Sequence, residues 1–271
     1  PPPLARYSRS GCASTLAFEL SSQGQRIIVN CGGKHSCFNV IYATCEAGDE
    51  VIIPAPYWLS YPEMAKLAGA KPVILDTTDE TEFKVTPEQL REAITPSTKL
   101  FILNSPSNPT GSVYSADEIK ALGDVCVEKG VLIMSDDIYE KLLYDGAEFT
   151  SVTGFSGEHK AHTIIVHGLA KAYSMTGWRI GFLAAPKPIA QAINAVQSHS
   201  TSNATSFAQK GAVAALNGPQ DHLGEWLAEF DKRRRCAAEQ LNAMPGISCI
   251  NSKGAFYLFP NMAPTGLKSA D

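Results

Sequence analysis

Short apolar strands separated by helix-like segments constrain the fold of this chain more than any other feature. Several of the strand-like runs are apolar throughout and do not alternate, so both faces of each strand are expected to be covered. These runs are RIIVN (26–30), EVIIP (50–54), KPVIL (71–75), KLFILN (99–104), GVLIMSD (130–136), TIIVHG (163–168) and RIGFLAA (179–185). Such an alternation predicts an α/β domain with a mostly parallel sheet sandwiched by helices.

The segments between these strands carry helix signals. Thr86 with Gln89, and Ser115 with Glu118, have the spacing of capping boxes, and Gly130 is placed to end the second helix. After residue 186 the pattern changes. Two helical segments are followed by two strand-like runs of a second unit: 187–217, 220–243, 246–250 and 254–260. Two strands are too few for a complete domain, so we expect the sequence to be a fragment.

Composition narrows the possible partners. A net charge of −4 gives no reason to expect nucleic acid or an anionic membrane surface. No apolar run approaches the roughly 20 residues that cross a bilayer, and the first residues lack the apolar centre of a secretory signal. The seven cysteines form no CxxC pair and no zinc-like group with histidine. We therefore expect no metal site and a reducing, cytoplasmic location.

Candidate chemistry follows the predicted strands. Lys171 comes just after 163–168, and its amine is expected at the sheet edge where α/β ligands collect, although a lone lysine is more often solvated. Arg179 offers a planar fork suited to phosphate, with a salt bridge as the equal alternative. Asp136 ends an apolar run, and its carboxylate is costly to bury unless it meets a cation. Asp137 is the competing carboxylate, and Tyr139 is close enough to reach the same ligand.

Three further turns add weaker signals. Asn108 lies in an Asn-Pro-Thr-Gly string that taken alone is only a tight turn. Gly33 and Lys34 open a helix after a strand, where backbone N–H groups bind anions, but no dinucleotide or P-loop fingerprint is present. Trp58 follows another strand and by itself is favoured as a core indole. Together these residues match what pyridoxal phosphate needs: a lysine, a carboxylate for the ring nitrogen, phenolic-oxygen donors, an aromatic face and a phosphate cradle.

The ordered motifs GGK, PYW, NSPSNPTG, SDDIYE, LAKAYSMTGWRIGF and GAFYLF resemble the class I aminotransferases of the fold-type I pyridoxal-phosphate enzymes. The resemblance is greatest to the bacterial aspartate aminotransferase subgroup and runs from about residue 26 to the end of the chain. It implies a fold-type I large domain and an incomplete small α+β domain. It also implies a homodimer that transfers an amino group, by a ping-pong mechanism, between a dicarboxylic amino acid (aspartate or glutamate) and a 2-oxo acid.

The resemblance also implies a role for each candidate. Lys171 would be the Schiff-base lysine and proton shuttle, and Asp136 would pair with the pyridine nitrogen. The remaining roles are binding of the phenolic oxygen by Tyr139 and Asn108, stacking by Trp58, and enclosure of the phosphate by Gly33, Lys34, Arg179 and, from the partner subunit, Tyr7. Lys34 would in addition meet the distal carboxylate of the substrate, beside Trp58 and Asn108.

Departures from the family pattern set the expected boundaries. We expect an N-terminal remnant over 1–10, a large domain over 11–235, and the start of a small domain over 236–271. The family arginine for the substrate α-carboxylate falls beyond Asp271, so we expect this chain to be weakly active or inactive. The alternatives are an inactive remnant or pseudogene product that keeps at most the cofactor pocket, and another fold-type I enzyme, either a lyase or a different transaminase. A dinucleotide-binding Rossmann protein would show the same alternation of strands and helices, but this sequence lacks the glycine fingerprint of that fold.

Overall fold

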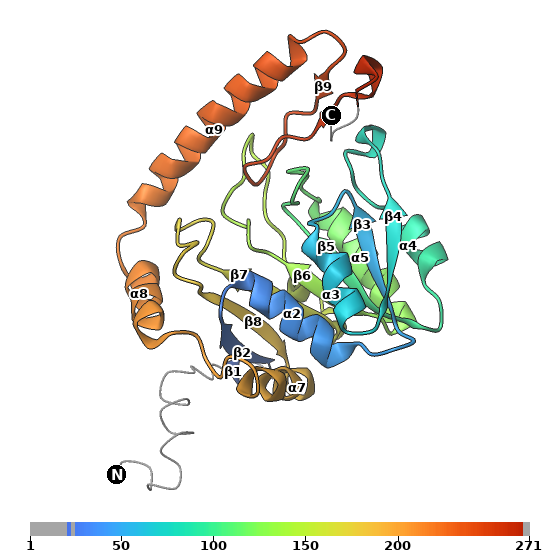
Figure 1. Cartoon of the computed structure of the whole chain (residues 1–271), viewed down its shortest axis with the longest axis vertical. Helices are drawn as coiled ribbons and strands as arrows, with labels where there is room; N and C mark the ends of the chain where they lie inside the picture. Colours follow the sequence, from blue (N-terminus) through green and yellow to red (C-terminus); the bar gives the residue numbers. More distant parts are fainter. Residues whose placement is uncertain (1–20, 23–24, 268–271) are drawn as a thin grey trace, which may run out of the picture.

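The computed structural model describes residues 21–22 and 25–267, and one twisted sheet runs through them (Figure 1). Its strands are β1 (Ser21–Ser22), β2 (Gln25–Asn30), β3 (Glu50–Ala55), β4 (Lys71–Asp76), β5 (Thr98–Asn104), β6 (Leu132–Asp136), β7 (Thr163–Gly168) and β8 (Gly181–Pro186). The order across the sheet is β1-β2-β8-β7-β6-β5-β3-β4. The strands from β3 to β7 pair in parallel, whereas β8 is antiparallel to both of its neighbours. The predicted mostly parallel sheet is confirmed.

Helices cover both faces of this sheet. Those named here are α2 (Gly33–Thr44), α3 (Ser60–Leu67), α4 (Pro87–Ala93), α5 (Ala116–Lys129), α6 (Gly157–His162), α7 (Lys187–Ser198), α8 (Ser206–Asn217) and α9 (Asp221–Asn242). Core residues of α2, α3 and α7 pack on one face, and those of α4 and α5 pack on the other. In β3, Val51 and Ile53 join the first core while Ile52 joins the second. Successive strand residues point to opposite faces, which explains the continuous apolar runs.

The predicted helix signals have the expected geometry. The Thr86 hydroxyl accepts a hydrogen bond from the Gln89 amide at the start of α4, and both halves of that capping box are formed. Ser115 and Glu118 form the second box at the start of α5. Gly130 ends α5 with a φ of 69°, a left-handed conformation that glycine adopts without steric cost.

Two predictions for the C-terminal part are wrong. The segment 187–217 is two helices, because residues 199–205 form turns between α7 and α8. The run 254–260 is not a strand. Gly254 forms an isolated antiparallel bridge with Leu143, and only the last residue of the run belongs to a strand, β10 (Pro260–Asn261), which pairs with β9 (Ser248–Cys249). The reason is tertiary. Ala255 has a φ of 55°, and the amides of Gly254 and Ala255 donate to carbonyls of distant loops instead of a neighbouring strand.

The predicted division of the chain remains a prediction. The boundary placed after residue 235 falls inside α9, which continues unbroken to Asn242 and reaches across the top of the molecule in Figure 1. The segment 1–10, with Tyr7, lies outside the described residues.

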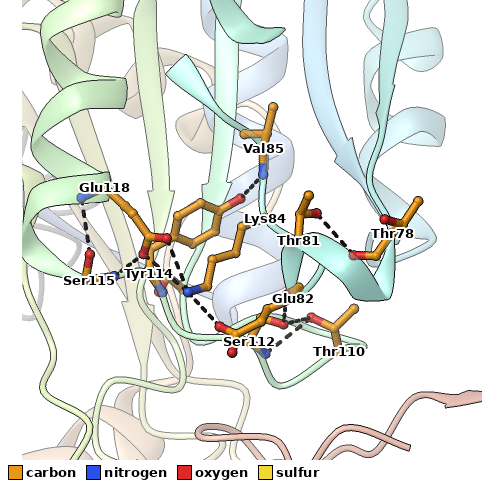
Figure 2. A network of polar contacts seen from close by, with 11 residues as sticks. Thr78, Thr81, Glu82, Lys84, Val85, Thr110, Ser112, Tyr114, Ser115 and Glu118 are labelled. Atoms are coloured by element: carbon orange, nitrogen blue, oxygen red, sulfur yellow. Dashed lines mark hydrogen bonds and ion pairs between the residues drawn. The ribbon is translucent and has the colours of Figure 1, made fainter. Parts of the chain in front are cut away.

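A polar network ties the connection before α4 to the connection before α5 (Figure 2). The Lys84 amine lies 3.0 Å from a carboxylate oxygen of Glu82 and 3.3 Å from one of Glu118, and its side chain is only 15% exposed. The Ser112 hydroxyl donates to the Glu82 carbonyl at 2.6 Å, and the Tyr114 hydroxyl accepts from the Val85 amide at 2.9 Å. The network therefore fixes the far end of the loop that carries Asn108.

Replacing Lys84 tests the energetic weight of this network. Because Lys84→Met leaves two carboxylates without their shared cation, we expect the free energy of unfolding to fall by roughly 1–2 kcal/mol. Lys66→Met is the matched control, since Lys66 pairs with Glu63 on the surface and is 57% exposed. Its loss should lower the free energy of unfolding far less, because a solvent-exposed ion pair adds little stability. Urea denaturation measures the free energy of unfolding of both variants. Equal losses of this free energy in the two variants would contradict a special role for Lys84.

Candidate active site

A cavity of about 240 Å³ lies at the carboxyl ends of β5, β6 and β7. Eight of the nine residues singled out from the sequence line it, and the ninth, Tyr7, lies outside the described residues. The lining residues are Gly33, Lys34, Trp58, Tyr61, Asn104, Asn108, Asp136, Ile138, Tyr139, Ala170, Lys171, Thr176, Arg179 and Tyr257. Segments far apart in sequence meet here because parallel strands bring their following loops to one edge.

Asp136 is the buried carboxylate of this cavity. It is 6% exposed and accepts hydrogen bonds from the Tyr61 hydroxyl at 2.6 Å and the Ile138 amide at 3.3 Å. Burial nevertheless raises the pKa of Asp136 above its ordinary value, while these hydrogen bonds oppose the shift. Asp137, the competing carboxylate, does not line the cavity and accepts from the Ser135 hydroxyl at 2.6 Å. The carboxylate facing the ligand space is therefore Asp136.

Lys171 lies in the turn between β7 and β8 and is half-buried. Its amine is 5.4 Å from the centroid of the Tyr139 ring and 5.2 Å from that of Phe256. Burial lowers the pKa of this amine below its ordinary value. The Asp136 carboxylate opposes that shift, and the Arg179 guanidinium adds to it. A larger fraction of Lys171 is thus neutral near pH 7 than of a surface lysine, which makes the amine both a nucleophile and a base.

The start of α2 forms an anion cradle at another part of the cavity. Gly32 precedes the helix with a φ of 89°, no side chain caps the helix, and its first turn holds no acidic residue. A Cβ at Gly32 would lie 2.4 Å from Nη2 of Arg179, so only glycine lets the guanidinium come this close. Unpaired N–H groups, the positive end of the helix dipole and a guanidinium together favour a phosphate-like group.

Trp58 is a wall of the cavity and not a fully buried core indole. It is half-buried, and its ring meets that of Tyr61 edge to face with centroids 5.2 Å apart. The Lys34 amine lies 4.9 Å from the Trp58 ring centroid, on the side of the cavity where α2 begins. A flat aromatic face and a cation thus border the same space.

Tyr139 and Asn108 face each other from the loops after β6 and β5. A hydrogen bond from Asn108 lowers the pKa of Tyr139, but burial outweighs it and raises that pKa well above the ordinary value. The Asn108 amide N–H donates to Oδ1 of Asn104 at 2.7 Å, and Nδ2 of Asn104 donates to the Asp136 carbonyl at 2.8 Å. This chain of hydrogen bonds fixes the loop of Asn108 to the end of β6.

Sequence reasoning gave no role to three aromatic residues in or beside the cavity. Tyr61 had a signal, since it lies one helical turn after Trp58 in the string PYWLSYPEM. Tyr257, whose hydroxyl is 2.6 Å from that of Tyr139, and its neighbour Phe256 lie in the motif GAFYLF, but nothing in that motif showed that this distant segment reaches the site. Only the tertiary structure reveals this contact.

No group of three or more His, Cys, Asp or Glu in the described residues is arranged to hold a metal ion. Within the same part of the chain, no helix has the length and apolar character needed to cross a membrane.

The sequence also matches known proteins. Residues 13–270 match the family model described as aminotransferase class I and II. The aspartate aminotransferase of Geobacillus stearothermophilus is 51% identical over 266 residues, which cover 94% of this chain and 68% of that protein. The aspartate/prephenate aminotransferase of Nitrosomonas europaea is 48% identical, with 94% and 67% covered.

Solved structures give the same answer. The aspartate aminotransferase from Rhizobium meliloti superimposes with a TM-score of 0.86 at 42% identity, covering 88% of this chain and 60% of that one. An aromatic aminotransferase from Pyrococcus horikoshii gives a TM-score of 0.87 at 34% identity, covering 96% and 70%. The chain thus spans 60–70% of the length of these relatives, and its fold and sequence both place it in the class I and II aminotransferase family.

Proposed function

We propose that this chain binds pyridoxal 5′-phosphate at the cavity and serves amino-group transfer from a dicarboxylic amino acid, aspartate or glutamate, to a 2-oxo acid. The class I and II family is pyridoxal-phosphate-dependent in general, and the relatives named aspartate aminotransferase support the substrate class. The observation that carries the proposal is one cavity holding a desolvated amine, Lys171, and a desolvated carboxylate, Asp136, beside the anion cradle.

The residues present fit this cofactor. Asp136 is buried with its pKa raised, and its printed hydrogen-bond donors are all neutral groups, so a protonated ring nitrogen would supply a cation in direct contact with it. The start of α2 and Arg179 would hold the phosphate, where a Cβ at Gly32 would block the approach. Tyr139 and Asn108 would donate to the phenolic oxygen, and Trp58 would cover the ring.

The chemistry divides between cofactor and chain. Pyridoxal phosphate, when bound, supplies an electron sink for the charge left at the α-carbon of an amino acid. Lys171 is the residue that would hold the cofactor covalently through Nζ, and the lowered pKa of its amine would suit it to take the α-proton as a base. Lys34, whose amine borders Trp58, would bind the distal carboxylate of the substrate.

A second copy of the chain is proposed as the partner. An apolar groove of about 480 Å³ adjoins the cavity, and Lys34 and Arg179 line both. Leu59 and Leu67 in this groove are 73% and 70% exposed, which is unfavourable for apolar side chains in water. In such a homodimer, the family resemblance implies that Tyr7 of the second copy would reach the phosphate. The cytoplasmic location expected from composition stays a prediction.

Covalent cofactor binding is the first test of the proposal. The 271-residue chain mixed with pyridoxal phosphate should develop a visible absorption band, and borohydride reduction followed by peptide mass spectrometry should find the label on Lys171. Lys171→Ala should abolish the band and the label, whereas Lys187→Ala, at an exposed lysine of α7, should leave both unchanged. A band that survives Lys171→Ala would contradict the proposal, and no band at all would favour the inactive-remnant alternative.

Replacing Asp136 by asparagine should stabilise the cofactor-free chain but weaken cofactor binding. Its folded-state pKa is raised, so the penalty of burying the ionised form is absent below the unfolded pKa of about 3.9 and complete above the folded value. At pH 7, Asp136→Asn should therefore raise the free energy of unfolding of the cofactor-free chain. The same change should weaken pyridoxal phosphate binding by about tenfold or more, because the ring nitrogen loses its counter-ion.

Asp137→Asn is the matched control for this test. Burial also raises the pKa of Asp137, so its replacement should stabilise the chain as well. Because Asp137 does not line the cavity, cofactor affinity should stay within about twofold. Urea denaturation and cofactor titration measure the two effects, and equal losses of affinity in both variants would refute the assignment of Asp136.

The dimer has its own test. Leu67→Glu places a charge in the apolar groove and should raise the dimer dissociation constant at least about tenfold. Met244→Glu, at an exposed apolar residue just beyond α9 and outside the groove, is the control. Sedimentation velocity over a range of concentrations measures both, and an unaltered dimer in Leu67→Glu would rule out this face as the interface.

A further inference from the structure

The segment Ser252–Tyr257 forms a wall of the cavity although it belongs to the last part of the chain. Its Tyr257 lines the cavity and contacts the Tyr139 hydroxyl at 2.6 Å. The ring of Phe256 has its centroid 5.2 Å from the Lys171 amine. The contacts that hold this segment in place therefore also determine the surroundings of Tyr139 and Lys171.

Backbone hydrogen bonds fasten the segment to two loops. The Ala255 amide donates to the Leu142 carbonyl, the Tyr144 amide to the Lys253 carbonyl, and the Gly254 amide to the Gly111 carbonyl, each at 2.9 Å. The fit is tight, because a Cβ at Gly254 would lie 2.5 Å from a side-chain atom of the loop after β5. The loops concerned are those that carry Tyr139 and Asn108.

A buried guanidinium completes the attachment. The side chain of Arg234, on α9, is 3% exposed, and its Nη1 donates to the Ser252 carbonyl at 2.7 Å. Its Nε donates to Oδ1 of Asp231 at 2.9 Å, and its Nη2 lies 2.9 Å from Oδ2 of Asp145. Its guanidinium carbon also lies 4.7 Å from the centroid of the Tyr144 ring. One side chain thus joins α9, the turn after Tyr139 and the cavity wall.

The contacts of Arg234 are more numerous and more deeply buried than those of a surface ion pair. The adjacent Arg233 is 71% exposed and pairs only with Glu229 on its own helix. Burying a guanidinium is costly unless every donor is matched, and the partners of Arg234 come from three separate segments. Lysine could not replace it, since an ammonium lacks the fork that reaches two carboxylates and a carbonyl together.

We propose that Arg234 is a positioning residue for the reaction: it holds Ser252–Tyr257 so that the Tyr257 hydroxyl orients the Tyr139 hydroxyl in the cavity. The inference rests on the proposed function, since Tyr139 matters chemically only as a donor to the cofactor. Arg234 itself lies outside the cavity and acts through the segment.

The first measurement uses the cofactor-free chain. Hydrogen exchange of the amides of Gly254 and Ala255 should be about tenfold faster or more in Arg234→Met, because the segment loses its anchor. Arg233→Met should leave these amides unchanged. If Arg234→Met does not fold, Arg234→Lys, which keeps the charge without the fork, replaces it. Unchanged exchange in the Arg234 variant would overturn the proposal.

The second measurement uses the chain loaded with pyridoxal phosphate. Loss of an oriented donor to an anionic oxygen should move the pH midpoint of the visible band upward by roughly one unit in Arg234→Met. Tyr257→Phe should cause a similar shift. Because both changes act on one contact, the double variant should shift little further than either single variant. A merely stabilising role of Arg234 would lower the melting temperature without moving the midpoint.

The outcomes separate this inference from the proposed function. A wild-type chain without a Lys171-dependent band would overturn both. A normal wild-type band with an unchanged midpoint in Arg234→Met would overturn the positioning role alone, as would shifts that simply add in the double variant. Faster exchange in the segment together with non-additive midpoint shifts would establish it.

Discussion

The rest of the site depends on one unfavourable interaction, the burial of the Asp136 carboxylate. A folded chain gains nothing from an ionised acid at the end of a buried strand. The hydrogen bonds that Asp136 accepts from Tyr61, the Ile138 amide and the Cys37 thiol do not cancel the cost. A cation bound in the cavity beside Asp136 would offset the free-energy cost of burying its ionised carboxylate. In the proposed function the ring nitrogen of the cofactor supplies that cation, so binding and stability are coupled.

The surroundings of Lys171 disfavour the positive charge of its amine, just as burial disfavours the negative charge of Asp136. The amine is kept in a half-buried place near Arg179, which disfavours its charge, while Asp136 partly offsets the effect. The start of α2 adds a positive field for an anion. The cavity thus combines a carboxylate that needs a cation, an amine that tends to lose its proton and a cradle for a phosphate-like group. This combination matches pyridoxal phosphate far better than any one residue does.

The segment Ser252–Tyr257, near the end of the sequence, becomes part of a cavity built mainly by residues that precede it. Ser252–Tyr257 gives up regular strand pairing to bond to the loops after β5 and β6, and Ala255 adopts a left-handed conformation in doing so. In turn, the polar network around Lys84 holds the other end of the Asn108 loop (Figure 2). The donors proposed for the phenolic oxygen are therefore supported from both sides by residues that never touch the ligand space.

The sequence by itself determined the layered α/β fold, its strands and capped helices, because apolar runs, capping boxes and Gly130 act locally. It also singled out eight of the cavity-lining residues, since the chemistry of a strand end can be read from the residues that follow it. The family resemblance already pointed to Asp136, and the tertiary structure gives the physical reason, because Asp136 lines the cavity and Asp137 does not. The tertiary structure alone brought Tyr257 against Tyr139 and Arg234 against Asp145, and it overruled the strand expected over 254–260, because these contacts join segments more than 80 residues apart.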